Sequence, residues 1–396
     1  ADTFHLIVPI DCGLYNEYRE VRTGAAHEQD QLHPISARRQ ACKRFGLHPD
    51  LPFLADLYEN QKKAAFVTNI GSLIEPVTRS TMKSRRTCQG MFSHSHQVSA
   101  AMTLECQVAG GAPAGIGGRI GDALASEGYK VESFSVSGAA RWSEGVETKM
   151  EIVDRKGGAV RLNAYGELRD VIGNITRQAY GNVYCEEYAQ SFADAVVSSE
   201  TLGKLLDEVQ LQTEYKTDSK LSQQLHQVAR LIATRGGRKA ERDFFFVAMS
   251  GFDTHQGLHA TFSAKMAEMD SALKGFVAEL RAQNIFDSTL LVTASDFGRT
   301  LTYNGLGTDH GWGGNHFVLG GSVKGGQILN EFPKTFALGG EYDAGRGRVI
   351  PKYPWESMMV PIAEWMGVTA PEAVFPNLGN FNHSTHIIQQ ESLFNR

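Results

Sequence analysis

Two apolar runs in the second half of the chain each end in a polar segment that carries an aspartate. FFFVAM leads into Asp253, and LLVTA leads into Asp296. Between them, apolar residues recur at spacings of three and four, which predicts one face of an α-helix: Phe262, Met266, Met269, Leu273, Phe276 and Leu280. The unit is therefore strand, helix, strand. Because ligands bind beyond the carboxyl ends of parallel strands, we expect both aspartates to lie at one edge of a sheet.

Histidines accompany these aspartates. His255 follows Asp253 after one residue, and a third polar loop supplies Asp309 and His310. Carboxylate and imidazole groups together suit borderline divalent metals such as zinc or manganese. The alternative is that each loop is an ordinary turn rich in glycine and aspartate. Three such loops converging at strand ends favour a metal site, with Asp296 as a further ligand.

The rest of the chain predicts an α/β protein with a helical addition. Strand-like runs occur at 4–10, 64–70 and 129–136, and short helices are expected at 51–60 and 355–367. From 142 to 242 the chain changes to mostly polar helices with one apolar face: Leu221, Leu225, Val228 and Ile232. We interpret residues 1–396 as one α/β domain and 142–242 as a helical insertion or cap, with a second domain as the alternative.

Two further positions carry candidate chemistry. Ser93 and His94 precede a predicted helix at 98–106, and a hydroxyl at a helix N-terminus is favoured as an attacking oxyanion. Ser93 could equally be a plain helix cap. Arg299 could bind a phosphate or sulfate oxygen through its planar guanidinium group, or it could pair with a nearby carboxylate. The SDFG sequence before Arg299 is no kinase signal, because the other kinase motifs are absent in order.

Composition narrows the class of protein. The chain has 396 residues, 42% of them hydrophobic, and a formal charge of −5, which is ordinary for a globular protein. The mixed charges give no basic footprint for nucleic acid. No apolar run reaches the roughly 18 residues of a membrane span. The first residues lack the basic and apolar regions of a signal peptide, so we expect none in this form of the chain.

Cysteines and glycosylation sequons bear on the compartment. The five cysteines have no CxxC spacing, which argues against a zinc-ribbon or thioredoxin-type site. Cys12 with Cys42, or Cys88 with Cys106, could form disulfides, and the odd count leaves at least one thiol unpaired. Sequons begin at Asn174 and Asn382. Together these features favour a secreted or lumenal glycoprotein.

Several motifs then resemble a known family. SGFDTHQG, SDFGRT and GTDHGWGGNHFVLGG, with GLHPDLPFLADLYEN and MFSHSHQ before them, resemble the DUF1501 family, which is usually grouped with the alkaline phosphatase/sulfatase superfamily. The resemblance covers nearly the whole chain and is weakest across 142–242. It implies an alkaline-phosphatase-like three-layer α/β/α sandwich with a mostly parallel sheet. It also implies one or two divalent metal ions (zinc, manganese, magnesium or calcium) at the strand ends.

The resemblance also implies ligand sets. One metal would be held by Asp253, His255 and His310. The other would be held by Asp2 and Asp296, with Asp309 as an addition. Residues 1–4 are similar to the end of the family's GGxDG-like loop, so we expect the glycines and the preceding strand upstream of the chain. Superfamily phosphatases commonly have a histidine where this chain has Phe297, which leaves an oxygen-dominated second site that suits magnesium, calcium or manganese.

The activity that the resemblance implies is metal-dependent hydrolysis of small phosphate esters, or less readily sulfate esters. The nucleophile would be a metal-bound water or Ser93, with Thr78 and Ser80 as competitors, and Arg299 or His94 would orient the non-bridging oxygens. A formylglycine-type sulfatase would need a CxPxR-like sequence, which the chain lacks. The alternative is a non-catalytic structural or interaction protein that retains the fold.

Overall fold

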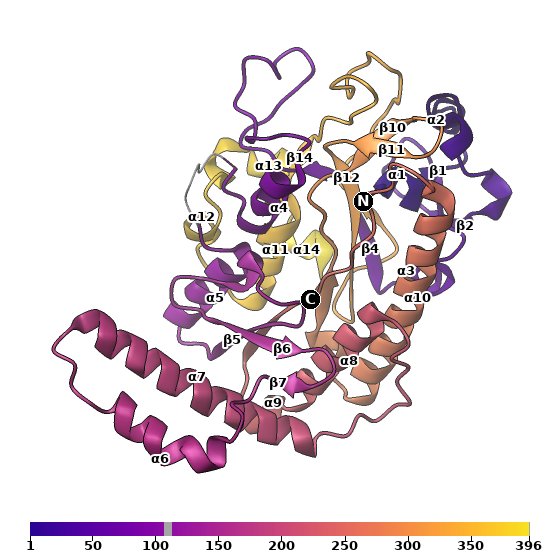
Figure 1. Ribbon diagram of the computed structural model, residues 1–396. Helices are drawn as coiled ribbons and strands as arrows, with labels where there is room; N and C mark the ends of the chain where they lie inside the picture. Colours follow the sequence, from indigo (N-terminus) through magenta and orange to yellow (C-terminus); the bar gives the residue numbers. More distant parts are fainter. Residues whose placement is uncertain (107–112, 396) are drawn as a thin grey trace.

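The computed structural model describes residues 1–106 and 113–395 as a mixed α/β protein (Figure 1). Its largest sheet has the order β13-β4-β12-β9, and β14 also pairs with β4. These strands are β4 (Ala64–Gly71), β9 (Leu290–Val292), β12 (Gly314–Gly320), β13 (Ile328–Leu329) and β14 (Tyr353–Pro354). A second sheet has the order β7-β6-β5-β8. Its strands are β5 (Val131–Ser135), β6 (Met150–Asp154), β7 (Gly158–Ala159) and β8 (Arg242–Phe246).

Two smaller sheets lie around the N-terminal segment and the candidate site. The first has the order β1-β3-β2 and contains β1 (Ile7–Pro9), β2 (His33–Ser36) and β3 (Arg44–Leu47). The second is the hairpin of β10 (Arg299–Tyr303) and β11 (Thr308–His310). The hairpin follows β9 in the chain and precedes β12. It carries Arg299, Asp309 and His310, three of the residues singled out in the sequence.

Helices cover both faces of the largest sheet (Figure 1). Successive side chains of a strand point to opposite faces. Phe66 and Phe317 accordingly belong to one apolar core, whereas Ala65, Val67 and Val318 belong to another. The first core includes side chains of α3 (Pro52–Glu59), α8 (Lys220–Ala233) and α10 (Leu258–Ala282). The second includes side chains of α5 (Ile116–Ser126) and α11 (Glu356–Met366).

The helix predicted between the two aspartate loops is confirmed. Helix α10 occupies Leu258–Ala282. Five of the six apolar positions that predicted it are buried, and Met269 is partly buried against the same core. The spacing of three and four therefore identified the face that packs against the sheet. Strand β4 and helices α3 and α11 also lie where the apolar pattern placed them.

The prediction of a mostly parallel sheet is wrong. Six of the ten strand pairings in the described residues are antiparallel, including both pairings of β12 with β4 and β9. The reason is the connection between β9 and β12. It contains the β10–β11 hairpin and no crossover helix, and a parallel return usually needs a crossover helix. Strand β12 therefore runs back alongside β9 in the opposite direction.

The segment 142–242 contains more than helices. It begins with β6 and β7 and continues with α6 (Tyr165–Thr176), α7 (Val183–Glu208), α8 and α9 (Arg235–Arg238). Helices α6 and α7 form a hairpin that projects from the body of the protein (Figure 1). Helix α8 instead contributes its predicted apolar face to the main core.

The remaining helices are short. The described residues also contain two disulfides. The helices are α1 (Thr3–Leu6), α2 (Leu14–Arg22), α4 (His94–Thr103), α12 (Pro371–Val374), α13 (His383–His386) and α14 (Gln390–Leu393). Both disulfides considered from the sequence are present, Cys12–Cys42 and Cys88–Cys106, and Cys185 is a free, exposed thiol. Among the described helices, none combines enough length with enough apolar character to cross a membrane.

Because several histidines are buried, we expect the folded protein to lose stability at acidic pH. Burial lowers the pKa of His27 to about 3 and that of His316 to about 3, both from 6.5. Between these values the unfolded chain binds protons that the folded protein does not bind, so the free energy of unfolding falls as the pH drops below 6.5. Urea unfolding at pH 7, 6 and 5 should show this fall. In the His27→Gln variant, the free energy of unfolding should fall less steeply with decreasing pH, by about 1.4 kcal/mol per pH unit. An unchanged slope in this variant would contradict the prediction.

Candidate active site

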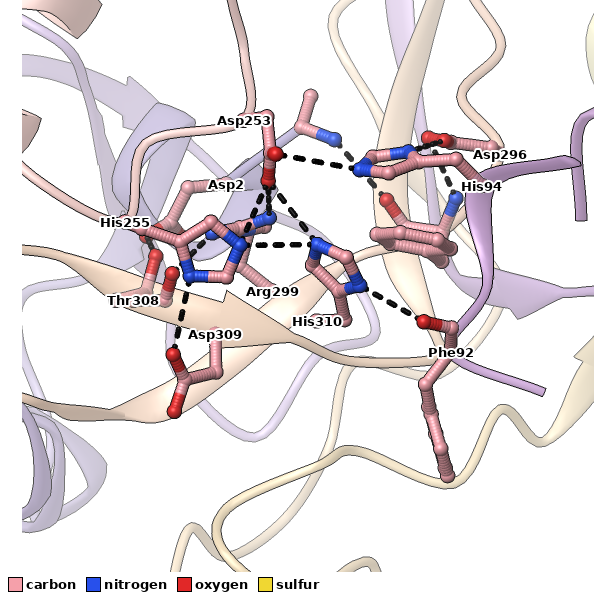
Figure 2. Close-up of polar contacts among 12 residues, drawn as sticks. Asp2, Phe92, His94, Asp253, His255, Asp296, Arg299, Thr308, Asp309 and His310 are labelled. Carbon is pink, nitrogen blue, oxygen red and sulfur yellow. Dashed lines mark hydrogen bonds and ion pairs between the residues drawn. The ribbon is translucent and has the colours of Figure 1, made fainter.

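The candidate active site is assembled from four segments that are distant in sequence (Figure 2). Asp253 and His255 lie between β8 and α10, and Asp296 lies between β9 and β10. His310 ends β11, and His94 is the first residue of α4. The structure thus brings the three predicted loops together, and it adds the start of α4.

Three potential ligand atoms meet at the centre of the site. Asp253 Oδ1 lies 3.1 Å from His255 Nε2 and 3.1 Å from His310 Nε2. The two Nε2 atoms are 3.0 Å apart. A tetrahedral zinc ion with bonds of about 2.0–2.1 Å holds its ligand atoms about 3.3 Å apart. The predicted set of Asp253, His255 and His310 therefore nearly forms one face of such a tetrahedron, and its donor atoms fit a borderline divalent ion.

Partners behind the two imidazoles orient them. His255 Nδ1 lies 3.1 Å from Asp309 Oδ1, and His310 Nδ1 lies 2.8 Å from the carbonyl oxygen of Phe92. A hydrogen bond at Nδ1 sets the tautomer in which Nε2 is free to bind a metal. Asp309 also forms an ion pair with Arg346, at 3.0 Å. Asp309 was predicted to be an additional ligand, but the structure places it behind His255 as an orienting group.

Arg299 does not have the predicted position facing a substrate. Its side chain is only 1% exposed, and its guanidinium group donates to Asp253 Oδ1 and to the carbonyl oxygen of Thr308. A buried guanidinium group that is bonded in this way cannot also bind the oxygens of a substrate. Arg299 instead balances the charge of Asp253 and holds its carboxylate in place. Of the two alternatives left open by the sequence, the pairing with a local carboxylate is confirmed, although the residue is buried.

His94 lies between two carboxylates. Its Nδ1 is 2.5 Å from Asp296 Oδ2, and its Nε2 is 3.4 Å from Asp253 Oδ2. His94, Asp253 and His310 each offer a ligand atom within 4.8 Å of the others. The buried ring of Phe297 packs against His94 with the ring centroids 4.8 Å apart. His94 therefore supplies an imidazole next to Asp296. From the sequence, His94 was predicted to orient substrate oxygens, and its place between Asp296 and Asp253 was not predicted.

Asp2 is bound by an arginine. Both of its oxygens accept hydrogen bonds from Arg22, at 2.8 and 3.3 Å, and Thr308 Oγ1 donates to Oδ2 at 3.0 Å. Neither Asp2 nor Arg22 is exposed to solvent. The charge of Asp2 is thus already balanced, and the structure does not join this carboxylate to Asp296. The set of Asp2 and Asp296 as metal ligands therefore stays a prediction, whereas Asp296 is in contact with His94.

The predicted nucleophile has no contact with the carboxylates. Ser93 caps α4, and its side chain makes no capping hydrogen bond. Its Oγ lies 3.3 Å from Ser95 Oγ and 3.4 Å from His96 Nδ1. The competing hydroxyl groups, Thr78 and Ser80, bond to each other at 3.0 Å. Ser93 neighbours His94 in the chain, and its role as nucleophile stays a prediction.

The electrostatics of the site favour ionised carboxylates. Burial opposes the ionisation of Asp253, but the hydrogen bond and charge of Arg299, with the two neighbouring histidines, lower its pKa to about 2. Burial likewise opposes ionisation of Asp296, but the nitrogen of Ala1 and the hydrogen bonds from His94, Ser295 and the Phe297 amide lower its pKa. Both carboxylates therefore carry negative charge near neutral pH, as metal ligands must.

Comparison with known proteins gives a family and no activity. Residues 129–341 match the family model described as "Protein of unknown function (DUF1501)". The matched segment spans more than half of the chain and contains Asp253, His255, Asp296, Asp309 and His310, whereas Asp2 and His94 lie outside it. No curated protein matches the chain.

Proposed function

The chain belongs to the DUF1501 family, and from its cluster of carboxylates and imidazoles we propose that it is a metal-dependent hydrolase of small phosphate esters. The observation that carries the proposal is the mutual spacing of 3.0–3.1 Å among Asp253 Oδ1, His255 Nε2 and His310 Nε2. We infer that these atoms hold one divalent ion. We also infer an alkaline-phosphatase-like sandwich, which agrees with helices on both faces of the largest sheet.

Different residues of the site would have different roles in the hydrolysis. A bound divalent ion would supply Lewis-acid chemistry, lowering the pKa of an attacking oxygen and offsetting negative charge on the phosphoryl group. His94 is 44% exposed on its side chain, and Asp296 fixes its ring through Nδ1. Its Nε2 is therefore the ring nitrogen left to accept a hydrogen bond, or a proton, from the attacking oxygen. The N-terminus of α4 adds a positive dipole end at the same place.

Sulfate esters are the less favoured substrates. Formylglycine chemistry requires a CxPxR-like sequence, and the chain has none. A second ion would have to bind at the pair of Asp296 and His94, which offers one oxygen-bearing and one nitrogen-bearing side chain. We propose that zinc or manganese suits both sets of donors better than calcium, because both include imidazole.

The assay of this proposal combines metal content with turnover. The full chain is treated with a chelator, reloaded with Zn²⁺, Mn²⁺, Mg²⁺ or Ca²⁺, and assayed with p-nitrophenyl phosphate, bis-p-nitrophenyl phosphate and p-nitrophenyl sulfate. We expect chelation to abolish phosphate ester hydrolysis and Zn²⁺ or Mn²⁺ to restore it. Folded protein that binds none of these ions at the Asp253 cluster and has no turnover would contradict the proposal.

One observation favours a second candidate, a non-catalytic structural or interaction protein. Arg299 already donates to the Asp253 oxygen that a metal would share with His255 and His310, so the buried guanidinium group could serve in place of a cation. The projecting hairpin of α6 and α7 also exposes several apolar side chains to solvent, among them Val183, Tyr184 and Tyr188. Absence of metal and turnover in the assay above would support this candidate.

We further propose a secreted or lumenal location. Two disulfides are typical of oxidising compartments, and both sequon asparagines, Asn174 and Asn382, are exposed. Digestion with an N-glycosidase should lower the apparent mass of protein made in a secretory host, and no change in mass would argue against glycosylation.

A further inference from the structure

A cluster of histidines lies beside the candidate active site but shares no residue with it. His5 on α1 has no solvent exposure, and His27 and His48 on loops are also buried, at 7% and 3% exposure. The His5 ring stacks on that of His27 with centroids 3.9 Å apart, and the rings of His27 and His48 are 4.8 Å apart. The ring of His259, on α10, lies 5.2 Å from that of His5. Buried imidazoles in such a group need a physical explanation.

The ring nitrogens of this cluster are only partly used. His27 Nε2 donates to the carbonyl oxygen of His5 at 3.2 Å, and His48 Nδ1 accepts a hydrogen bond from the Asp50 backbone N–H, also at 3.2 Å. Each of these rings keeps a second nitrogen. His5 Nε2 is enclosed and has no hydrogen-bond partner among the described residues. A buried polar atom without a partner costs free energy unless something else binds it.

The three rings lie close enough together to share one metal ion. One ring nitrogen from each of His5, His27 and His48 lies within 4.8 Å of the other two. Tetrahedral coordination with bonds of about 2.0–2.1 Å needs nitrogens about 3.3 Å apart, so a bound ion would draw the nitrogens together and turn the stacked rings of His5 and His27 apart. His48 Nδ1 is also 3.6 Å from the Asp50 carboxylate, which would accept the Nδ1 proton of a ring that binds the ion through Nε2.

The charges around the cluster allow a cation. Arg22 approaches His5 Nδ1 at 3.5 Å, but its positive charge is balanced by the ion pair with Asp2. Burial lowers the pKa of all three rings below 6.5. Neighbouring positive groups add to this effect at His5 and His27, whereas the Asp50 carboxylate opposes it at His48. At neutral pH the rings are therefore neutral, which is the form that binds a metal.

We propose that His5, His27 and His48 form a second metal site, which binds a zinc- or copper-type ion and is independent of the Asp253 cluster. Three imidazoles without a carboxylate ligand suit zinc and copper, whereas magnesium and calcium prefer oxygen donors. The site is enclosed, so its role is structural. It joins α1 to the loops that carry His27 and His48.

The decisive protein is the double variant Asp253→Asn/His310→Asn, which lacks the first site and leaves the histidine cluster intact. After chelation and titration with Zn²⁺, we expect it to bind about one equivalent and to melt at a higher temperature. Mg²⁺ should have neither effect. With Cu²⁺, its electron paramagnetic resonance spectrum should show coupling to imidazole nitrogens.

Variants of the cluster identify the ligands. Adding His27→Phe or His48→Phe to the double variant should lower the affinity for Zn²⁺ by at least about tenfold. His226→Phe is the matched control, since this half-buried histidine of α8 packs against Tyr215 outside the cluster and should not change binding. The proposal is overturned if the double variant binds no Zn²⁺, or if its copper spectrum lacks nitrogen coupling. Neither result decides whether the Asp253 cluster binds a metal, because the ester hydrolysis assay of the unmodified chain measures that site separately.

Discussion

Replacing Asp253 by asparagine is expected to abolish metal binding at the candidate active site and to lower kcat/KM for phosphate esters by about 100- to 1000-fold. Asp253 Oδ1 lies 3.1 Å from both His255 Nε2 and His310 Nε2. Asparagine keeps the shape of the side chain but removes the charge that a cation requires. Metal analysis and the p-nitrophenyl phosphate assay measure the two effects on the same sample.

Asp309→Asn is the graded control for this variant. Asp309 contacts His255 Nδ1 from behind and is not at the centre of the site. Loss of such an orienting carboxylate typically costs about 10- to 100-fold in metal affinity or activity. We therefore expect Asp309→Asn to retain more activity than Asp253→Asn. Wild-type turnover in Asp253→Asn would exclude the hydrolase proposal, and equal losses in both variants would argue that Asp309 is itself a ligand.

Replacing Arg22 by methionine is expected to lower the free energy of unfolding by about 3–5 kcal/mol, because it leaves a buried carboxylate without its partner. Arg22 and Asp2 have no solvent exposure and are joined by a pair of hydrogen bonds. Urea unfolding monitored by circular dichroism measures the change. The double variant Asp2→Asn/Arg22→Met should recover much of the loss, since it removes both charges.

Arg19→Met is the matched control on the same helix. Arg19 pairs with Glu28 at 3.1 Å, but both side chains are more than half exposed, and an exposed pair contributes about 0–1 kcal/mol. A cost for Arg22→Met as small as that for Arg19→Met would contradict the prediction. Asp2→Asn addresses the role that the family resemblance implies. If this variant loses the metal of the Asp253 cluster while remaining folded, Asp2 is a ligand after all.

Several local features of this protein were predictable from its sequence. Helix α10 was predicted because an amphipathic helix repeats its apolar residues at a spacing set by the helix itself. The polar loops after β8 and β9 were predicted to converge, and Asp253, His255 and His310 do meet. The shared sheet edge expected for the two aspartates is not what brings them together, because β8 and β9 belong to different sheets. The loops meet because the tertiary structure places the ends of these two strands side by side.

The sequence by itself thus determined the secondary structure around the site and the residue types available to bind a metal. Only the tertiary structure decided which charges are paired and which remain free. It buried Arg299 against Asp253, joined Asp2 to Arg22, and placed His94 between two carboxylates. It also made β12 antiparallel and stacked His5 on His27. These outcomes depend on contacts between residues far apart in the chain, and neither periodicity nor local spacing contains that information.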